Sequence, residues 1–327
     1  MASAEDDLIG RYFRPLATDA GALGLIDDAA TLKSTGDDLV VTTDAIVEGV
    51  HFLPDDPPQT VAQKALRVNL SDLAAKGALP AGFVLTLALR EISDAWLAPF
   101  AHALGEDAAQ FKCPLLGGDT VSTPGPAMIS ITAFGRVPPG KMVRRDGARV
   151  GDLVAVTGTI GDAALGLKVL QKGSAAVMVA DDPASRDALI GRYRVPQPRN
   201  ALAAAVRDHA SAAMDVSDGL AGDLAKLCRA SSVSALVELV SVPLSPVAIR
   251  ALVQGAADLE TVLGGGDDYE ILCTVPENRW EAFVGAARTA QVPVTVIGRI
   301  VAGSQEPGFV DGAGQPVVLK RLSYSHF

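Results

Sequence analysis

The chain has 327 residues, of which 49% are hydrophobic, 20% charged and only 5% aromatic. This length exceeds what one hydrophobic core usually supports, so we expect two domains built mainly from Ala, Val, Leu and Ile, a mixture that favours α/β layers. The formal charge of -10 and the pI near 4.9 exclude a surface built for nucleic acid or anionic membranes, because such surfaces need clustered Lys and Arg. If the ligand is a polyphosphate, bound cations must neutralise the charge between it and this acidic protein.

Cysteine usage and hydropathy predict where the protein works. The three cysteines Cys113, Cys228 and Cys273 lie in apolar surroundings without a C-x-x-C spacing, which is typical of packed thiols in a reducing compartment. No basic-then-apolar leader opens the sequence, and no uninterrupted apolar run reaches the roughly 18 residues that a membrane span needs. We therefore expect a cytoplasmic protein.

The first half of the chain alternates predicted helices and strands. The helices cover residues 5–16, 60–76 and 94–111, and the strands cover 39–44, 82–89, 115–116 and 128–137. Thr60 and Asp94 are the expected caps of the second and third helix. The strand 39–44 is expected to carry Thr42, Thr43 and Asp44 at its tip, and the strand 115–116 is expected to break at the glycines that follow.

The turn Pro138-Pro139-Gly140 and the polar stretch after it interrupt the periodicity and make the best domain boundary. We expect an N-terminal domain over 1–140 and a C-terminal domain over 141–327. The second half is predicted to hold strands over 153–157, 212–216, 233–240, 269–275 and 294–300, and helices after 162, over 199–209, over 218–230, after Ser245 and over 277–290.

Aspartates recur just beyond apolar strands or in the first turn of helices. They are Asp28, Asp44, Asp119, Asp215, Asp218, Asp267 and Asp268. A single aspartate at such a place is most often a helix N-cap. Several in one chain, with few His and Cys residues, favour Mg²⁺ over zinc, because Mg²⁺ prefers carboxylate, hydroxyl and phosphate oxygens. These strand ends are predicted to converge on metal ions and phosphates.

Glycine pairs and triplets beside these aspartates suit a phosphate ligand. Backbone N–H groups approach a phosphate only where no Cβ intervenes, which fits Gly117-Gly118 and the stretch 264–266. The sequence has no G-x-x-x-x-G-K-[ST] motif, which excludes a P-loop NTPase. Gly158 and Gly161 lack the full dinucleotide fingerprint and are interpreted as a tight turn.

Six motifs in chain order resemble the thiamine-monophosphate kinase family, of the superfamily of aminoimidazole-ribonucleotide synthetase and selenophosphate synthetase. They are Thr-Thr-Asp at 42–44, Glu-Gly-Val-His-Phe at 48–52, Asn-Leu-Ser-Asp-Leu-Ala-Ala at 69–75, Gly-Gly-Asp-Thr at 117–120, Asp-Val-Ser-Asp-Gly-Leu at 215–220 and Gly-Gly-Asp-Asp-Tyr-Glu at 265–270. The ending Tyr-Ser-His-Phe at 324–327 is also similar. The ordered set spans nearly the whole chain.

The resemblance implies a two-domain fold with α/β and α+β parts. The sheet of the N-terminal α/β domain is expected to pair with that of a second subunit, closing a barrel in a homodimer. ATP is expected in the cleft between this domain and the C-terminal α+β domain. The implied reaction is direct, in-line, Mg-assisted transfer of the ATP γ-phosphoryl group to thiamine monophosphate. The product is thiamine diphosphate, and the reaction is the last step of thiamine diphosphate biosynthesis. Neither nucleic acid nor a membrane is an expected partner.

The resemblance also implies roles for individual residues. Several Mg²⁺ ions are expected on Asp28, Thr42, Thr43, Asp44, Asp72, Asp119, Asp215 and Asp218, with Asp44 and Asp119 acting in catalysis through the metal. Gly118, Arg145 and Ser217 match positions that contact the nucleotide, and His51, Asp267 and Tyr324 match positions that hold thiamine monophosphate. Two positions depart from the family pattern, Ile26 where a glycine is usual and Asp267 where a glutamate is usual.

Three other functions stay open at this point. One is another ATP-using synthetase of the same superfamily, although His51, Phe52 and the Tyr324 ending favour the thiamine enzyme. The second is a metal-dependent phosphohydrolase, and the third is a non-catalytic metal or nucleotide sensor. For the kinase, an acceptor phosphate is already largely ionised near pH 7, so His51 is expected to contact substrate rather than to act as a general base.

Overall fold

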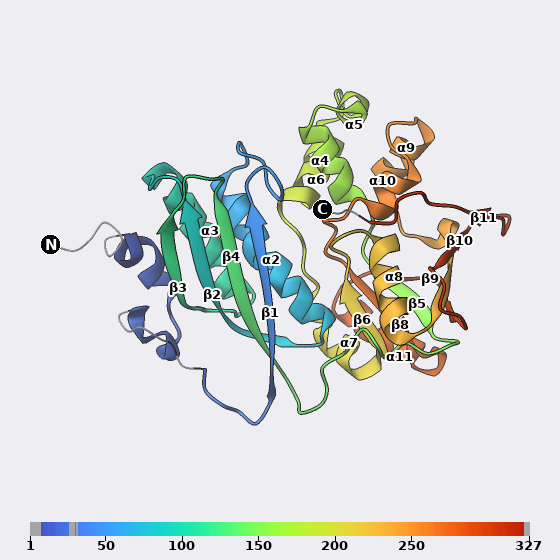
Figure 1. The fold of residues 1–327 in the computed structure, drawn as a ribbon, viewed down its shortest axis with the longest axis horizontal. Helices are drawn as coiled ribbons and strands as arrows, with labels where there is room; N and C mark the ends of the chain where they lie inside the picture. The colour runs from blue at the N-terminus through green and yellow to red at the C-terminus, as the bar shows by residue number, and fades with distance from the viewer. Residues whose placement is uncertain (1–7, 26–29, 31, 324–327) are drawn as a thin grey trace. The chain divides into compact units, whose positions relative to one another are not determined.

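The computed structural model describes residues 8–25, 30 and 32–323 (Figure 1). The chain divides into two compact units, the first comprising Met1–Leu73 and Ala78–Gly140 and the second Ala74–Gly77 and Lys141–Phe327. Both units combine helices with a β-sheet, so the expected two-domain organisation with α/β layers is confirmed. Within the described residues no helix is both long and apolar enough to cross a membrane.

The first unit consists of a four-stranded sheet, two long helices and three short helical turns. In chain order they are η1 (Ile9–Phe13), η2 (Arg14–Leu16), η3 (Ala20–Leu25), β1 (Asp38–Val47), α2 (Pro58–Ala75), β2 (Leu79–Leu89), α3 (Asp94–Gln110), β3 (Leu115–Ser122) and β4 (Met128–Val137). The opening helix predicted over 5–16 is thus a π-helical turn followed by a 3₁₀ turn where it falls within the described residues.

The sheet of the first unit has the strand order β1-β4-β2-β3. Strand β4 pairs antiparallel with both β1 and β2, whereas β2 and β3 pair in parallel. Figure 1 shows α2 and α3 together on one face of this sheet, where Phe83, Leu85 and Ile131 form a buried core with helix residues such as Leu66 and Leu104. Strands β1 and β3 are therefore the two opposite edges of the sheet.

The other face of this sheet, called the open face below, carries apolar side chains that remain exposed. They are Leu39 (46% exposed), Val41 (56%), Leu79 (54%) and Val121 (44%). Side chains on a strand alternate between faces, and every second residue of β4 is only half-buried on this side. An uncovered apolar sheet face is typical of a surface that meets another protein.

An ion pair buried beneath the sheet joins the two helices. Arg67 of α2 donates from Nε and Nη2 to the carboxylate of Asp107 on α3, at 2.6 and 2.8 Å. The side chains are only 6% and 2% exposed. A bidentate pair satisfies both charges while fixing the angle between the helices.

Several expectations for the first unit were wrong in detail. Strand β1 continues three residues beyond Asp44, so residues 42–44 lie in its interior instead of at its tip. Strand β3 runs through the glycines to Ser122 because it pairs with β2 along that whole stretch. Helix α2 begins at Pro58, so Thr60 is not its cap, and the N-cap position of α3 is Ser93. Asp94 instead accepts a hydrogen bond from the hydroxyl of Tyr12 at 2.6 Å.

The second unit contains a seven-stranded mixed sheet and a larger set of helices. In chain order they are β5 (Leu153–Thr157), α4 (Asp162–Leu170), α5 (Ser174–Met178), α6 (Pro183–Arg194), η4 (Asn200–Leu202), α7 (Ala203–His209), β6 (Ala212–Asp215), α8 (Leu220–Ser231), β7 (Ser234–Glu238), η5 (Leu239–Ser241), α9 (Pro246–Val253), α10 (Leu259–Gly264), β8 (Ile271–Val275), η6 (Glu277–Arg279), α11 (Trp280–Thr289), β9 (Val294–Val301), β10 (Gly308–Val310) and β11 (Pro316–Val317). The strand order is β11-β10-β7-β9-β5-β8-β6.

Apolar side chains cover both faces of this second sheet. Val154 and Met214 pack with α8 residues on one face, while their neighbours Ala155 and Ala213 pack with α7 and α11 residues, including Phe283, on the other. Strands buried on both faces are continuous apolar runs, which is why β5, β6 and β8 were predictable from sequence. Ser245 caps α9 as expected, its Oγ accepting a hydrogen bond from the amide of Ala248 at 3.1 Å.

Five α-helices and strands of the second unit were not predicted, and the end of the strand expected over 233–240 is instead the 3₁₀ turn η5. Helix α6 has only Leu189 and Tyr193 fully buried among twelve residues, so its apolar periodicity is weak. Helices α5 and α10 have five and six residues, and β10 and β11 have three and two. Elements this short give too few turns or alternations to be recognised from pattern.

Candidate functional site

Threonine and aspartate side chains from β1 and α2 meet on the helix-covered face of the first sheet. Thr42 donates from Oγ1 to Oδ2 of Asp72, near the end of α2, at 2.5 Å. Asp44 lies two residues further along β1 and therefore on the same face, with its side chain exposed. These three residues, the β1–α2 group, offer a hydroxyl and two carboxylates to one side of the strand.

Thr43 points the opposite way. Its hydroxyl donates to the carbonyl of Ile131 at 3.2 Å and accepts from the hydroxyl of Thr132 at 3.0 Å, both on β4. The side chains of Thr42 and Thr43 therefore occupy different faces of the sheet. The hydroxyl of Thr43 therefore does not belong to the β1–α2 group.

Asp119 lies far from the β1–α2 group within one chain. It stands on β3, the opposite edge of the sheet, which is three strand spacings or about 14 Å from β1. The register aligns Asp119 with Thr86, Ser130 and Ala45, which places its side chain on the open face. Within the described residues its exposed carboxylate makes no hydrogen bond or ion pair.

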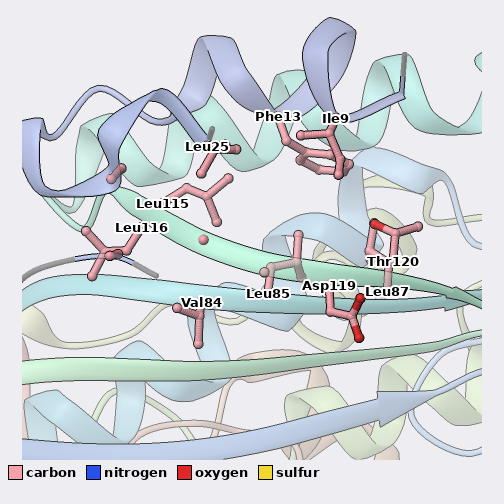
Figure 2. Close-up of a pocket in the computed structure, with 14 residues that line it drawn as sticks. Ile9, Phe13, Leu25, Val84, Leu85, Leu87, Leu115, Leu116, Asp119 and Thr120 are labelled. Carbon is pink, nitrogen blue, oxygen red and sulfur yellow. The ribbon is translucent and has the colours of Figure 1, made fainter. Parts of the chain in front are cut away.

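A cavity of about 270 Å³ lies beside β3 (Figure 2). Its walls are apolar side chains from η1, η3, β2 and β3, among them Phe13, Leu25 and Leu116. Asp119 and Thr120 line it further along β3, where Figure 2 shows their oxygen atoms. The cavity thus combines an apolar region with a carboxylate and a hydroxyl, a composition that suits a ligand with one apolar and one charged part.

The sheet itself gives Gly118 a reason to be glycine. A Cβ at this position would lie 2.0 Å from the carbonyl oxygen of Leu85 on β2. Gly117 has open space around its Cβ position. The close approach of β3 to β2 therefore requires Gly118 independently of the phosphate contact that the sequence suggested.

The loop after β1 holds His51 from several sides. Gly49 has a left-handed backbone with φ of 81° and donates its amide to the carbonyl of Phe52 at 2.7 Å, while the buried Lys64 donates to the carbonyl of His51 at 2.8 Å. The ring Nδ1 accepts the amide proton of Val47 at 3.0 Å. A neutral His51 must therefore carry its proton on Nε2, so this nitrogen is a hydrogen-bond donor.

In the second unit, Asp223 organises the turn after β6. Its fully buried carboxylate accepts the amides of Ser217 and Asp218 at 3.0 Å each and the ammonium of Lys226 at 2.8 Å. Burial raises the pKa of Asp223 against these hydrogen bonds. Lys226 also pairs with Asp218, so a metal ion would have to compete with this lysine for the Asp218 carboxylate. Asp215, the last residue of β6, is buried.

The loop 264–270 runs beside this turn. Asp267 donates its amide to the carbonyl of Ser217, and Tyr269 donates to that of Val216, both at 2.8 Å. Both donors have left-handed backbones, with φ of 65° and 50°. A Cβ on Gly266 would lie 2.5 Å from the carbonyl oxygen of Ser217, so glycine is required for this contact. Two predicted site residues, Ser217 and Asp267, are thereby brought together.

A buried charge cluster behind this loop was not predicted. Glu270 is fully buried and accepts hydrogen bonds from Thr157 Oγ1 at 2.6 Å, Arg192 Nη2 at 2.9 Å and Arg199 Nε at 2.7 Å. The sequence offered one signal, a glutamate directly before the apolar strand β8, where no helix follows for it to cap. Its two arginine partners lie more than 70 residues away, which no local pattern reveals.

The remaining predicted residues have less structural context. Arg145 is exposed, and its carbonyl accepts a hydrogen bond from Ser231 at 2.7 Å, while the neighbouring Arg144 pairs with Asp146. Asp28 and Tyr324, together with Ile26, lie outside the described residues. The roles assigned to them stay predictions.

The available donors fit Mg²⁺ better than zinc. Within the described residues no three His, Cys, Asp or Glu side chains gather closely enough to hold a metal ion by themselves. The β1–α2 group and Asp119 instead supply small numbers of hard oxygen atoms at accessible places. Mg²⁺ is commonly bound by one or two carboxylates, with water and substrate phosphates completing its coordination.

Comparison with known proteins identifies the relatives of this chain. The profile of the AIR synthase related protein N-terminal domain matches residues 26–137, and that of the C-terminal domain matches residues 149–311. A thiamine-monophosphate kinase of Caulobacter vibrioides is 46% identical over 98% of this chain and 90% of its own length.

Two solved structures extend the comparison. A thiamine-monophosphate kinase from Stenotrophomonas maltophilia K279a superposes with a TM-score of 0.83 at 39% identity, covering 97% of this chain and 99% of the other. A structure described as AaThiL complexed with AMPPCP and TMP has a TM-score of 0.77 at 32% identity, covering 92% and 91% of the two chains.

The buried Asp268 in loop 264–270 should make stability depend on pH. Burial raises the pKa of its carboxyl from 3.8 to about 8, against the hydrogen bond from the amide of Gly161. Between these pH values the folded chain keeps a proton that the unfolded chain has lost, so the free energy of unfolding falls as pH rises. Asp268→Asn should therefore gain stability relative to the parent from about pH 4 to about pH 8, measured by urea unfolding.

Asp182 provides a control of opposite sign. A hydrogen bond from the hydroxyl of Ser185, followed by those of Arg250 and the Ser185 amide, lowers the pKa of Asp182 to about 2. The parent should therefore lose stability relative to Asp182→Asn only as pH falls below about 4, toward about 2. A stability difference for Asp268→Asn that stays constant with pH would contradict the expected proton uptake.

Proposed function

This chain belongs to the AIR synthase related protein family and, within it, to the thiamine-monophosphate kinases, and from this we propose that it transfers the γ-phosphoryl group of ATP to the phosphate of thiamine monophosphate. The products are thiamine diphosphate and ADP. The observation that carries the proposal is 46% identity to a kinase of this name over 98% of the chain. The AMPPCP and TMP bound by a relative fit an ATP analogue and the acceptor of this reaction.

An assay with separated thiamine esters tests this function. The protein is incubated with ATP, MgCl₂ and thiamine monophosphate, and we expect thiamine diphosphate and ADP to form in equal amounts. ADP release that does not need thiamine monophosphate would indicate a phosphohydrolase. Thermal stabilisation by ATP without turnover would indicate a sensor, and either result would contradict the kinase proposal.

Charge is the main physical problem of this reaction. ATP and a phosphate monoester bring together about six negative charges at pH 7, and the chain itself carries a formal charge of -10. Mg²⁺, when bound, would offset the negative charge of the phosphates. We assign Mg²⁺ binding to Asp28, Thr42, Asp44, Asp72, Asp119, Asp215 and Asp218, with Thr43 contributing through its main chain.

The protein's own groups then orient the two substrates. The cavity beside β3 reaches Gly118 and Asp119, so we assign it to the nucleotide, with Arg145 and Ser217 as further contacts. His51 can donate from Nε2 to the acceptor, which Asp267 and Tyr324 also hold in this proposal. No group has to remove a proton, because the attacking phosphate oxygen is already ionised.

A homodimer resolves the separation of Asp44 and Asp119. In one chain they lie on opposite edges of the sheet, about 14 Å apart, too far to share an ion. Pairing β1 of one copy with β3 of another closes two four-stranded sheets into a barrel and brings these edges together. The same closure would bury the apolar side chains of the open face. Because Asp44 lies on the helix-covered face and Asp119 on the open face, their carboxylates would approach a shared ion from the two sides of the joined edges, and each metal site would then need both subunits.

Mixed dimers test this shared site. Asp44→Asn and Asp119→Asn should each slow turnover at least a hundredfold, or about 2.7 kcal/mol of transition-state stabilisation. A dimer combining one subunit of each variant keeps one site with both aspartates intact, so it should recover about half of the parental activity. Tagged, co-expressed subunits allow the mixed dimer to be purified and assayed. Sites built within single chains would leave the mixed dimer as inactive as its parents.

His51 should affect the acceptor alone. Because His51 donates a hydrogen bond instead of accepting a proton, His51→Ala should raise KM for thiamine monophosphate about tenfold while changing kcat less than about threefold. Steady-state kinetics at saturating ATP measure both constants. His102→Ala is the matched control, since His102 lies exposed on α3, and it should change neither. A collapse of kcat at unchanged KM would contradict the contact role of His51.

A further inference from the structure

Loop 264–270 has a backbone that needs support from outside. Asp267 and Tyr269 adopt left-handed conformations with φ of 65° and 50°, which side chains with a Cβ rarely adopt. Their amides are fixed on the carbonyls of Ser217 and Val216, and Val216 in turn donates to the carbonyl of Glu270 at 2.8 Å. Such conformations persist where surrounding contacts outweigh their cost.

Glu270 supplies charged contacts at the end of this loop. Its carboxylate has no exposed surface and binds two guanidinium groups, with Arg199 donating from both Nε and Nη2 at 2.7 and 2.5 Å. Thr157 connects the same carboxylate to β8, since its hydroxyl donates to Glu270 and accepts the amide of Ile271 at 2.8 Å. The end of the loop is thereby tied to strand β5.

Arg192 links this carboxylate to the loop backbone. Its Nη2 donates to Oε1 of Glu270 at 2.9 Å and to the carbonyl of Asp268 at 3.2 Å, directly after Asp267. Gly158 leaves the space that this arrangement needs, because a Cβ there would lie 2.1 Å from Oε1 of Glu270. Glu270, Arg192, Arg199 and Gly158 are distant from one another or lie in different elements, and they meet behind this loop.

We propose that Glu270, held by Arg192 and Arg199, is a positioning residue that fixes loop 264–270 so that Asp267 meets the acceptor substrate. The inference rests on the proposed function, in which Asp267 contacts thiamine monophosphate. Glu270 itself is fully buried and acts only through the loop. The position of Asp267 then depends on Arg192 and Arg199, which lie 78 and 71 residues before Glu270 in the sequence. These residues would add a determinant of substrate specificity to the site.

A double-mutant cycle separates positioning from a general structural role. Glu270→Gln keeps the size of the side chain but removes its charge, and it should raise KM for thiamine monophosphate about fivefold at unchanged KM for ATP. In an Asp267→Asn background, Glu270→Gln should alter KM for thiamine monophosphate less than about twofold, because the carboxylate that Glu270 positions is already lost. Glu277→Gln, which breaks the exposed pair with Arg299, is the control and should alter neither constant. Additive effects of the two substitutions would overturn the proposal.

Amide hydrogen exchange gives a readout that needs no substrate. In Glu270→Gln the amides of Asp267 and Tyr269 should exchange at least about tenfold faster, while those of β5 keep their protection. Unchanged exchange of these two amides overturns the positioning role. If Glu270→Gln does not fold, Arg192→Lys replaces it in both experiments, with the same expected results and the same overturning ones. If the parent enzyme makes no thiamine diphosphate, the proposed function is overturned. If the parent is active but Glu270→Gln and Asp267→Asn have additive effects on KM, only the positioning role of Glu270 is overturned.

Discussion

The hydrogen-bonded pairing of β1 with β4 decides what each residue of the Thr-Thr-Asp motif can do. The ladder fixes a strict alternation, so Thr42 and Asp44 face helix α2 while Thr43 faces β4 neighbours on the open face. A register shifted by one residue would exchange the two sets and remove the contact between Thr42 and Asp72. Because β1 pairs only with β4, it is also an edge strand of the sheet. The alternation of side chains and the edge position of β1 together decide where Thr42, Thr43 and Asp44 lie.

Much of this arrangement could be predicted from the sequence, because apolar runs mark strands such as β4 and β5 clearly. The strand order could not, since it depends on pairing between segments that are distant in sequence. This is why Asp44 and Asp119 were expected to lie near each other, although they occupy opposite edges of one sheet. Motif matching finds residues that occur together in a family without stating how far apart they lie in one chain.

Glycines show a second limit of reasoning from sequence. Gly118 and Gly266 were interpreted as making room for phosphate, and the structure gives each a packing reason of its own, against the carbonyl oxygens of Leu85 and Ser217. The buried Glu270 cluster escaped detection for a related reason, because Arg192 lies in helix α6, which has little apolar periodicity, and Arg199 lies outside that helix, before η4. Residues that shape a site through backbone contacts leave weaker sequence signals than residues that carry its charges.

The exposed edges of the first sheet have a consequence for the isolated chain. Strands β1 and β3 have ten and eight residues, and each presents one row of backbone N–H and C=O groups without a strand partner in the described structure. Long edges next to an apolar face act as templates on which other chains add as strands. An isolated copy therefore exposes two edges on which other chains can add as strands, so its tendency to aggregate should rise with protein concentration.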